Sequence, residues 1–266
     1  MNDTRSGTVS QKPLVPHPER LLQPSTLAQS WDFGVVSADT YPFFAPYRVV
    51  NTPSGEQHGP TGRVPRLLSA IFSTLIHYDD PCWNAETRVL EFRDGWSATT
   101  QTLRIYRSQP SRDAVDACLT KMRRFPVSSQ RQCVAIEDVC IERGRRVPSS
   151  VTLTPEYAQA CQRNLREVSF ATMHDLTGSL ELDLYVFAAL YAPDDGRLRV
   201  TRRFLTRMLP GSSRRINSAS QREQLFASLN TAQDRWTYTM SDDGDAVFIT
   251  GRAAVELDES RTVSLG

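Results

Sequence analysis

Three segments carry apolar residues at the spacing of an α-helix. The first runs from Leu67 to Ile76 after Pro65. The second follows Ser111 as N-cap, and the third follows Ser218, which forms a capping box with Gln221. The inward positions of the last two are Val115, Leu119 and Met122, and Leu225, Phe226 and Leu229. A shorter helix is expected after Thr154, because Pro155 suits the first helical position.

The clearest β pattern spans residues 179–192, where leucines at 180, 182 and 184 alternate with Glu181 and Asp183. We expect a strand there, a turn over residues 193–196, and a hairpin partner over residues 197–205. Shorter strands are predicted at 89–92, 102–106, 133–136 and 139–141, with a turn or bulge at Glu137-Asp138, and a final hairpin is predicted over 236–249. Hairpins mixed with isolated helices predict an α+β fold built on antiparallel sheet.

Prolines recur through residues 1–65, with Ser, Thr, Gln and Gly between them. This pattern predicts a flexible arm over residues 1–65, followed by a single domain over residues 66–266. The arm contains two apolar islands, which we expect either to dock on a partner or to pack on the chain's own domain. The residues assigned to self-association through this arm are Trp31, Phe33, Tyr41, Phe43, Phe44 and Tyr47.

Composition restricts the classes of partner. The 266 residues are 39% hydrophobic and carry a formal net charge of +1, so any attraction to nucleic acid or membrane must come from a local patch. The sequence has neither a membrane-spanning apolar run nor a secretory signal, so we expect a location in the cytoplasm or nucleus of a host cell, peripheral on membranes. The five cysteines are widely spaced and are expected to be reduced.

Candidate chemistry is sparse. Neither a phosphate-binding glycine loop nor a nucleophile elbow occurs. The His77, Asp79, Asp80 and Cys82 group is interpreted as a helix end and turn rather than a metal site, and His174-Asp175 as a loop pair rather than a catalytic base. Asp242-Asp243-Gly244-Asp245 is interpreted as a hairpin turn rather than a calcium loop. We therefore predict a non-enzymatic protein without metal or cofactor, with an active site assembled only in three dimensions as the alternative.

One stretch is strongly basic. Seven arginines occur between Arg197 and Arg215 without an acidic residue, and Phe204 is the only aromatic among them. We interpret the stretch either as a solvated face or as a surface that contacts the phosphates of lipid headgroups or nucleic acid. The residues are Arg197, Arg199, Arg202, Arg203, Arg207, Arg214 and Arg215. If alternation holds, Arg197, Arg199 and Arg203 share a strand face opposite Leu198, Val200 and Phe204.

Three segments resemble rhabdovirus matrix proteins, over roughly residues 100–255. Residues 102–110, which run into the Ser111 helix, are similar to the opening strand and helix of that family. Residues 153–157, followed by Thr177-Gly178-Ser179-Leu180-Glu181-Leu182, resemble its proline-glutamate turn and G-x-x-E-L strand. The Ser218 helix and the hairpin that ends at 245–249 resemble its closing elements. The chain departs from the family in its lysine-poor arm and in lacking PPxY and PTAP motifs.

The resemblance implies a viral matrix protein, a structural component of the virion that self-associates and links an anionic membrane to a ribonucleoprotein during assembly and budding. Its partners would be itself, the membrane surface, the nucleocapsid or RNA, and host proteins through the arm. The alternative is a viral RNA-binding accessory protein, of the movement or silencing-suppressor type, that uses the same arginines.

Overall fold

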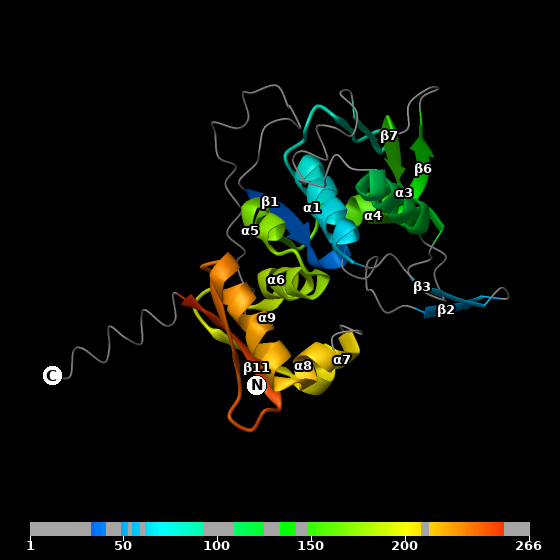
Figure 1. Cartoon of the computed structure of the whole chain (residues 1–266). Helices are drawn as coiled ribbons and strands as arrows, with labels where there is room; N and C mark the ends of the chain where they lie inside the picture. The colour runs from blue at the N-terminus through cyan, green and yellow to red at the C-terminus, as the bar shows by residue number, and fades with distance from the viewer. Residues whose placement is uncertain are drawn as a thin grey trace, which may run out of the picture.

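The computed structural model describes residues 33–40, 49–52, 55–58, 62–92, 109–124, 134–141, 148–208 and 213–252 (Figure 1). The predicted α+β class is confirmed, and every strand pair among these residues is antiparallel. The expected strand at 102–106 and the arm residues Trp31, Tyr41, Phe43, Phe44 and Tyr47 lie outside the described residues.

The first half of the chain packs around helix α1 (Arg63–His77), whose residues from Pro65 to Ile76 are all buried. A four-stranded sheet in the order β4-β5-β7-β6 lies beside α1. A bulge between Ile136 and Asp138 in β6 confirms the irregularity predicted near Glu137-Asp138. The sheet strands are β4 (Trp83–Asn84), β5 (Val89–Glu91), β6 (Ile136–Cys140) and β7 (Ser150–Leu153), and β2 (Val49–Thr52) and β3 (Gly55–His58) form a separate hairpin.

Two predicted helices are present in this half. Helix α3 (Gln109–Arg124) buries Val115, Leu119 and Met122 as expected, although it begins two residues before Ser111. Helix α4 (Pro155–Ala160) begins after Thr154, whose hydroxyl accepts the Tyr157 N–H at 3.3 Å and donates to the Val134 carbonyl at 2.7 Å.

Strand β1 (Phe33–Ser37) corrects the description of residues 1–65 as an arm without regular structure. It pairs with β8 (Leu165–Ser169), and its Val35 and Val36 are buried against the core. The Val35 N–H also donates to Thr74 Oγ1 in α1 at 2.9 Å. These two valines belong to the core. Pairing with β8 satisfies their backbone, and β-branched side chains suit a strand whose side chains are buried. Strands β2 and β3 and the first residues of α1 also lie within residues 1–65, and the division into arm and domain stays a prediction.

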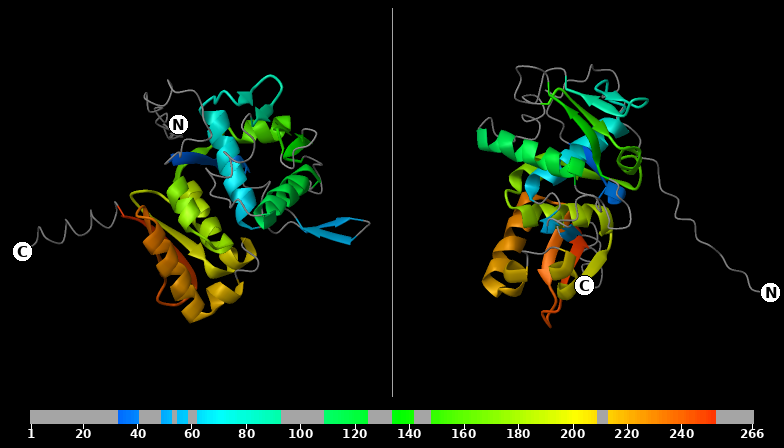
Figure 2. Two further views of the ribbon diagram at one scale, coloured as in Figure 1. Left: turned by 45° about the horizontal axis from the view of Figure 1, so that its top comes forward. Right: turned by 90° about the vertical axis from the view of Figure 1, so that its right-hand side faces the viewer.

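Helix α6 (Ser179–Tyr191) corrects the clearest strand of the sequence analysis. Every residue from Leu180 to Leu190 is buried, including Glu181 and Asp183. A helix surrounded by protein has no polar face, so its sequence lacks the 3.6-residue period and two paired acids imitate a strand alternation. The strand that the family resemblance implies at 177–182 is likewise the start of α6. Figure 2 places α6 between the α1 half and the C-terminal sheet with its covering helix.

The C-terminal part is a three-stranded sheet in the order β10-β11-β9, and the predicted final hairpin is its β10 (Trp236–Met240) and β11 (Ala246–Gly251). Strand β9 (Arg197–Thr201) pairs with β11 instead of with residues 179–192. Helix α9 (Ala219–Ala232) follows Ser218 as predicted, but no side-chain hydrogen bond caps it. The remaining helices are α5 (Phe170–Asp175), α7 (Arg202–Met208) and α8 (Ser213–Asn217).

Candidate functional site

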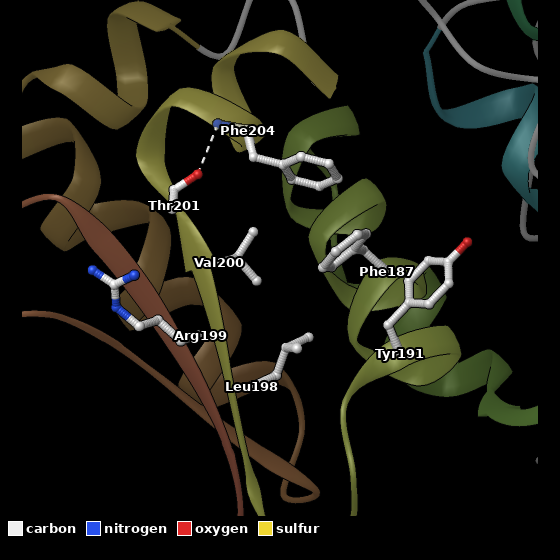
Figure 3. Close-up of a pocket in the computed structure, with 7 residues that line it drawn as sticks. All are labelled: Phe187, Tyr191, Leu198, Arg199, Val200, Thr201 and Phe204. Atoms are coloured by element: carbon white, nitrogen blue, oxygen red, sulfur yellow. Dashed lines mark hydrogen bonds between the residues drawn. The ribbon is translucent and has the colours of Figure 1, made fainter.

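An open groove of about 570 Å³ lies between the C-terminal turns of α6 and strand β9 (Figure 3). Phe187 projects from α6 toward Leu198 and Val200 of β9, and Tyr191 lies beside Phe187 with its hydroxyl directed away from the strand. Phe204 from the start of α7 closes one end. The Arg199 side chain points to the other face of the sheet, so the groove surface is almost entirely apolar. A concave apolar site with few polar groups is the usual form of a binding site in proteins.

Two aromatic residues of the groove are unusually exposed. The exposed fractions are 44% for Phe204 and 47% for Tyr191, although Phe187 between them is buried. The ring centroids of Phe187 lie 4.9 Å from Tyr191 and 6.3 Å from Phe204, so the three rings form one continuous surface. Exposed aromatics next to a concave apolar surface are typical of protein interaction sites.

The polar groups at the groove have local roles. Thr201 Oγ1 accepts the Phe204 N–H at 3.2 Å and so fixes the first turn of α7 (Figure 3). Burial, together with the charge of Asp39, raises the pKa of the Tyr191 hydroxyl, which therefore stays a neutral hydrogen-bond donor at physiological pH. Asp39 follows β1, so the chain leaves the described part at Thr40 close to the Tyr191 end of the groove.

Ion pairs hold the α6 wall in place from both sides. The Arg215 guanidinium of α8 donates to both carboxylate oxygens of Glu181, at 3.0 and 2.6 Å. The Arg66 Nε of α1 donates to Asp183 Oδ1 at 2.5 Å, and both residues are buried. Beyond the helix, Arg235 donates to both oxygens of Asp194 at 2.7 and 3.0 Å. A bidentate arginine fixes the direction as well as the distance of its partner, so the first turns of α6 are anchored to α1 and α8.

The structure divides the seven predicted arginines. Arg197 and Arg199 lie exposed on the outer face of β9, with Leu198 and Val200 on the inner face, as expected. Arg203 is in α7 rather than on that strand, because β9 ends at Thr201. Arg202 lies 3.9 Å from Asp245, and Arg215 is ion-paired with Glu181, so its charge is compensated within the chain. Arg207 and Arg214 lie in α7 and α8, and their side chains are outside the described part.

The other candidates have local structural roles. Asp80 Oδ1 accepts the Cys82 N–H at 2.9 Å in the turn after α1, and His174 Nδ1 contacts Asp175 Oδ1 at 2.9 Å. The described residues contain no group of three or more His, Cys, Asp and Glu side chains that could hold a metal ion. No helix among them is long and apolar enough to cross a membrane. Phe33 is 45% exposed on β1, and the other residues assigned to self-association lie outside the described part.

Comparison with known proteins adds no family. No family model matches the sequence, and no curated protein matches it at a significant level. The groove was missed from sequence because Phe187 and Tyr191 lay in the segment interpreted as a strand. Read as a helix, residues 187 and 191 are one turn apart and share a face, which is the signal that identifies them.

Proposed function

We propose that this protein is a non-enzymatic assembly protein that self-associates by receiving an apolar segment of a neighbouring copy in the groove between α6 and β9. The observation that supports this proposal best is the groove itself, in which the half-exposed rings of Tyr191 and Phe204 lie beside the edge strand β9. Within the matrix-like hypothesis, such an array would link an anionic membrane to a ribonucleoprotein. The proposal requires neither a cofactor nor a catalytic group.

The edge of β9 supports binding of an extended segment. Gly251 N–H donates to the Gly196 carbonyl at 2.9 Å and Arg202 N–H donates to the Asp245 carbonyl at 2.8 Å. Even-numbered residues of β9 therefore direct their backbone groups toward β11, and the odd-numbered ones direct theirs to the other side. β9 has no strand neighbour on that side among the described residues. An unpaired edge of this kind accepts another strand by main-chain hydrogen bonds.

Residues 41–47 of a second copy are the segment we assign to the groove. Their sequence is Tyr-Pro-Phe-Phe-Ala-Pro-Tyr, with prolines only at even positions. An extended chain alternates both its side chains and its N–H groups. In parallel pairing, residues 41, 43, 45 and 47 would direct their N–H groups to β9 and place their side chains on the face of Leu198 and Val200, while the two prolines point outward. Tyr41, Phe43 and Tyr47 would then share one face against the rings of the groove. The outward prolines would stop further strand addition.

The groove also lies where a neighbour can exchange this segment. Residue 41 directly follows Thr40, whose hydroxyl is fixed by the Ser37 carbonyl at 2.8 Å and the Ser69 hydroxyl at 3.1 Å. The charge of nearby Asp39 reaches Tyr191 in the groove. Two copies that face each other across their grooves would each present residues 41–47 next to the site that receives them, which gives a closed, self-complementary interface.

Phe204→Ser tests the groove. Loss of one aromatic that becomes buried on association is worth about 1.5–3 kcal/mol, so we expect the dissociation constant to rise roughly 10- to 150-fold. Sedimentation velocity over a concentration series at low salt measures this. Ile141→Ser, which changes a 54% exposed residue directly after β6, is the matched control and should associate like the wild type. Unchanged self-association of Phe204→Ser in a folded protein would overturn the proposal.

A further inference from the structure

The outer face of the C-terminal sheet brings an aromatic ring among the arginines. Phe248 of β11 is paired with Arg199 of β9, and the Arg197 guanidinium lies over its ring, 3.3 Å from the centroid. Phe248 is 49 positions from Arg199 in the sequence, so the sequence alone does not identify it as a neighbour of the arginine run. Phe204 faces the groove on the opposite side, whereas Phe248 shares the face of the two arginines.

The remaining positions of this face are small and polar. Cross-strand pairing puts Thr201, Thr237, Thr239 and Thr250 on the same side as Phe248. Helices α6 and α9 pack against the opposite face, where Tyr185 meets Trp236 and Phe226 meets Tyr238. None of β9, β10 and β11 contains an acidic residue. The result is a face of arginines and threonine hydroxyls around one ring.

Acidic groups border this face at its ends. Asp245 lies 3.9 Å from Arg202 in the β10–β11 turn. The pKa of Asp243 there is lowered by hydrogen bonds from the Ser241 hydroxyl and the Asp245 N–H, and to a smaller extent by the charge of Arg199. At the other end the Asp194 carboxylate accepts hydrogen bonds from Nε and Nη2 of Arg235. A polyanion is therefore disfavoured at the β10–β11 turn and favoured at the centre of the face. It would run across the strands, over Phe248.

We propose that this face binds single-stranded nucleic acid, with a base stacked on Phe248 and the flanking phosphates bound by Arg197 and Arg199. The guanidinium over the ring is planar and cationic, and it occupies the position that a base takes on an aromatic platform. Arg197 is exposed, so on binding it turns from the ring to a phosphate. The threonine hydroxyls offer donors and acceptors to bases and sugars.

A stacking ring distinguishes this ligand from an anionic membrane. A lipid headgroup would use the guanidinium charges but would gain nothing from a ring that lies half-buried on the sheet face. A duplex would present phosphates while its bases stay stacked on each other. The proposal does not depend on self-association, because the outer face and the groove lie on opposite sides of β9.

The test uses the full chain with Phe204→Ser as background, so that changes in oligomeric state do not affect the readout. Fluorescence anisotropy with a labelled 12-residue oligouridylate is measured over a salt series. Phe248→Leu should weaken binding about 5- to 150-fold, the factor for loss of one base stack of ~1–3 kcal/mol, and Phe248→Tyr should restore it. Arg197→Gln and Arg199→Gln should each reduce the slope of log K against log salt by about 0.7.

Controls separate the ring from general charge. Arg124→Gln removes an exposed arginine from α3 and should leave the affinity unchanged. Duplex RNA should bind more weakly and should not respond to Phe248→Leu. Vesicles of phosphatidylserine and phosphatidylcholine, tested by flotation, provide the competing source of phosphate. Equal affinity of Phe248→Leu and its background for the oligouridylate would overturn the proposal, and so would arginine-dependent flotation without arginine-dependent RNA binding.

Discussion

At the scale of single residues, two buried acids define the centre of this protein. Asp183 and Arg66 are each 5% exposed and form one ion pair, while Glu181 is 7% exposed and is bound by Arg215. Burial raises the pKa of Asp183, and the charge of Arg66 acts against that rise. Two charges in such an environment are tolerated only together, because either one alone would lose its hydration without compensation. These pairs therefore fix the position of α6 more than they add to overall stability.

Removing one member of the buried pair is expected to cost far more than removing an exposed one. Asp183→Ala leaves Arg66 charged and buried, so we expect the free energy of unfolding to fall by about 3–5 kcal/mol. Urea unfolding followed by circular dichroism measures this. Glu137→Ala breaks the exposed pair with Arg88, whose two side chains are 54% and 33% exposed, and should cost about 0–1 kcal/mol. Similar losses in the two variants would contradict the assigned role of Asp183.

At the scale of elements, the sequence predicts what local chemistry determines and fails where tertiary burial overrides it. Helices α1, α3, α4 and α9 were identified from apolar spacing and capping residues, and the β10–β11 hairpin from its turn. Helix α6 was misread because the arginines that pair with its acids come from α1 and α8. Strand β1 was missed because its partner β8 is more than a hundred residues away, and no local pattern announces such a pair.

The caps at Thr154 and Ser218 differ in the structure and should differ in energy. Thr154 accepts the N–H of Tyr157 and also donates to the Val134 carbonyl, so Thr154→Ala should lower the free energy of unfolding by about 0.5–2 kcal/mol. Ser218 is the N-cap of α9 but makes no capping hydrogen bond, so Ser218→Ala should change stability by less than half as much. Thermal unfolding of both variants decides this. A larger loss at Ser218 would mean that the capping box predicted from the sequence does form.

At the scale of the whole molecule, both proposed sites come from elements that are distant in sequence. The groove joins the end of α6 to β9 and the start of α7, and the outer face joins β9 to β11. The arginines of β9 and the aromatic island at residues 41–47 are recognisable in the sequence, but their neighbours in space are not. The helical structure of α6 places Phe187 and Tyr191 beside β9, and the register of β9 with β11 places Phe248 beside the arginines.

The central claim is that a segment of one copy enters the groove of another, and a mixing experiment tests it most directly. One variant carries Tyr41→Ser, Phe43→Ser and Tyr47→Ser, and the other carries Phe204→Ser. Each keeps one half of the interface and should be largely monomeric alone. Phe44→Ser, at an outward position of the same segment, is the matched control and should associate like the wild type.

Fluorescence-detected sedimentation of an equimolar mixture of the two variants provides the readout. We predict heterodimers, because the intact segment of the groove variant binds the intact groove of the segment variant. Association of the wild type without any association in the mixture would contradict exchange between copies. Undiminished self-association of the groove variant would contradict the groove itself.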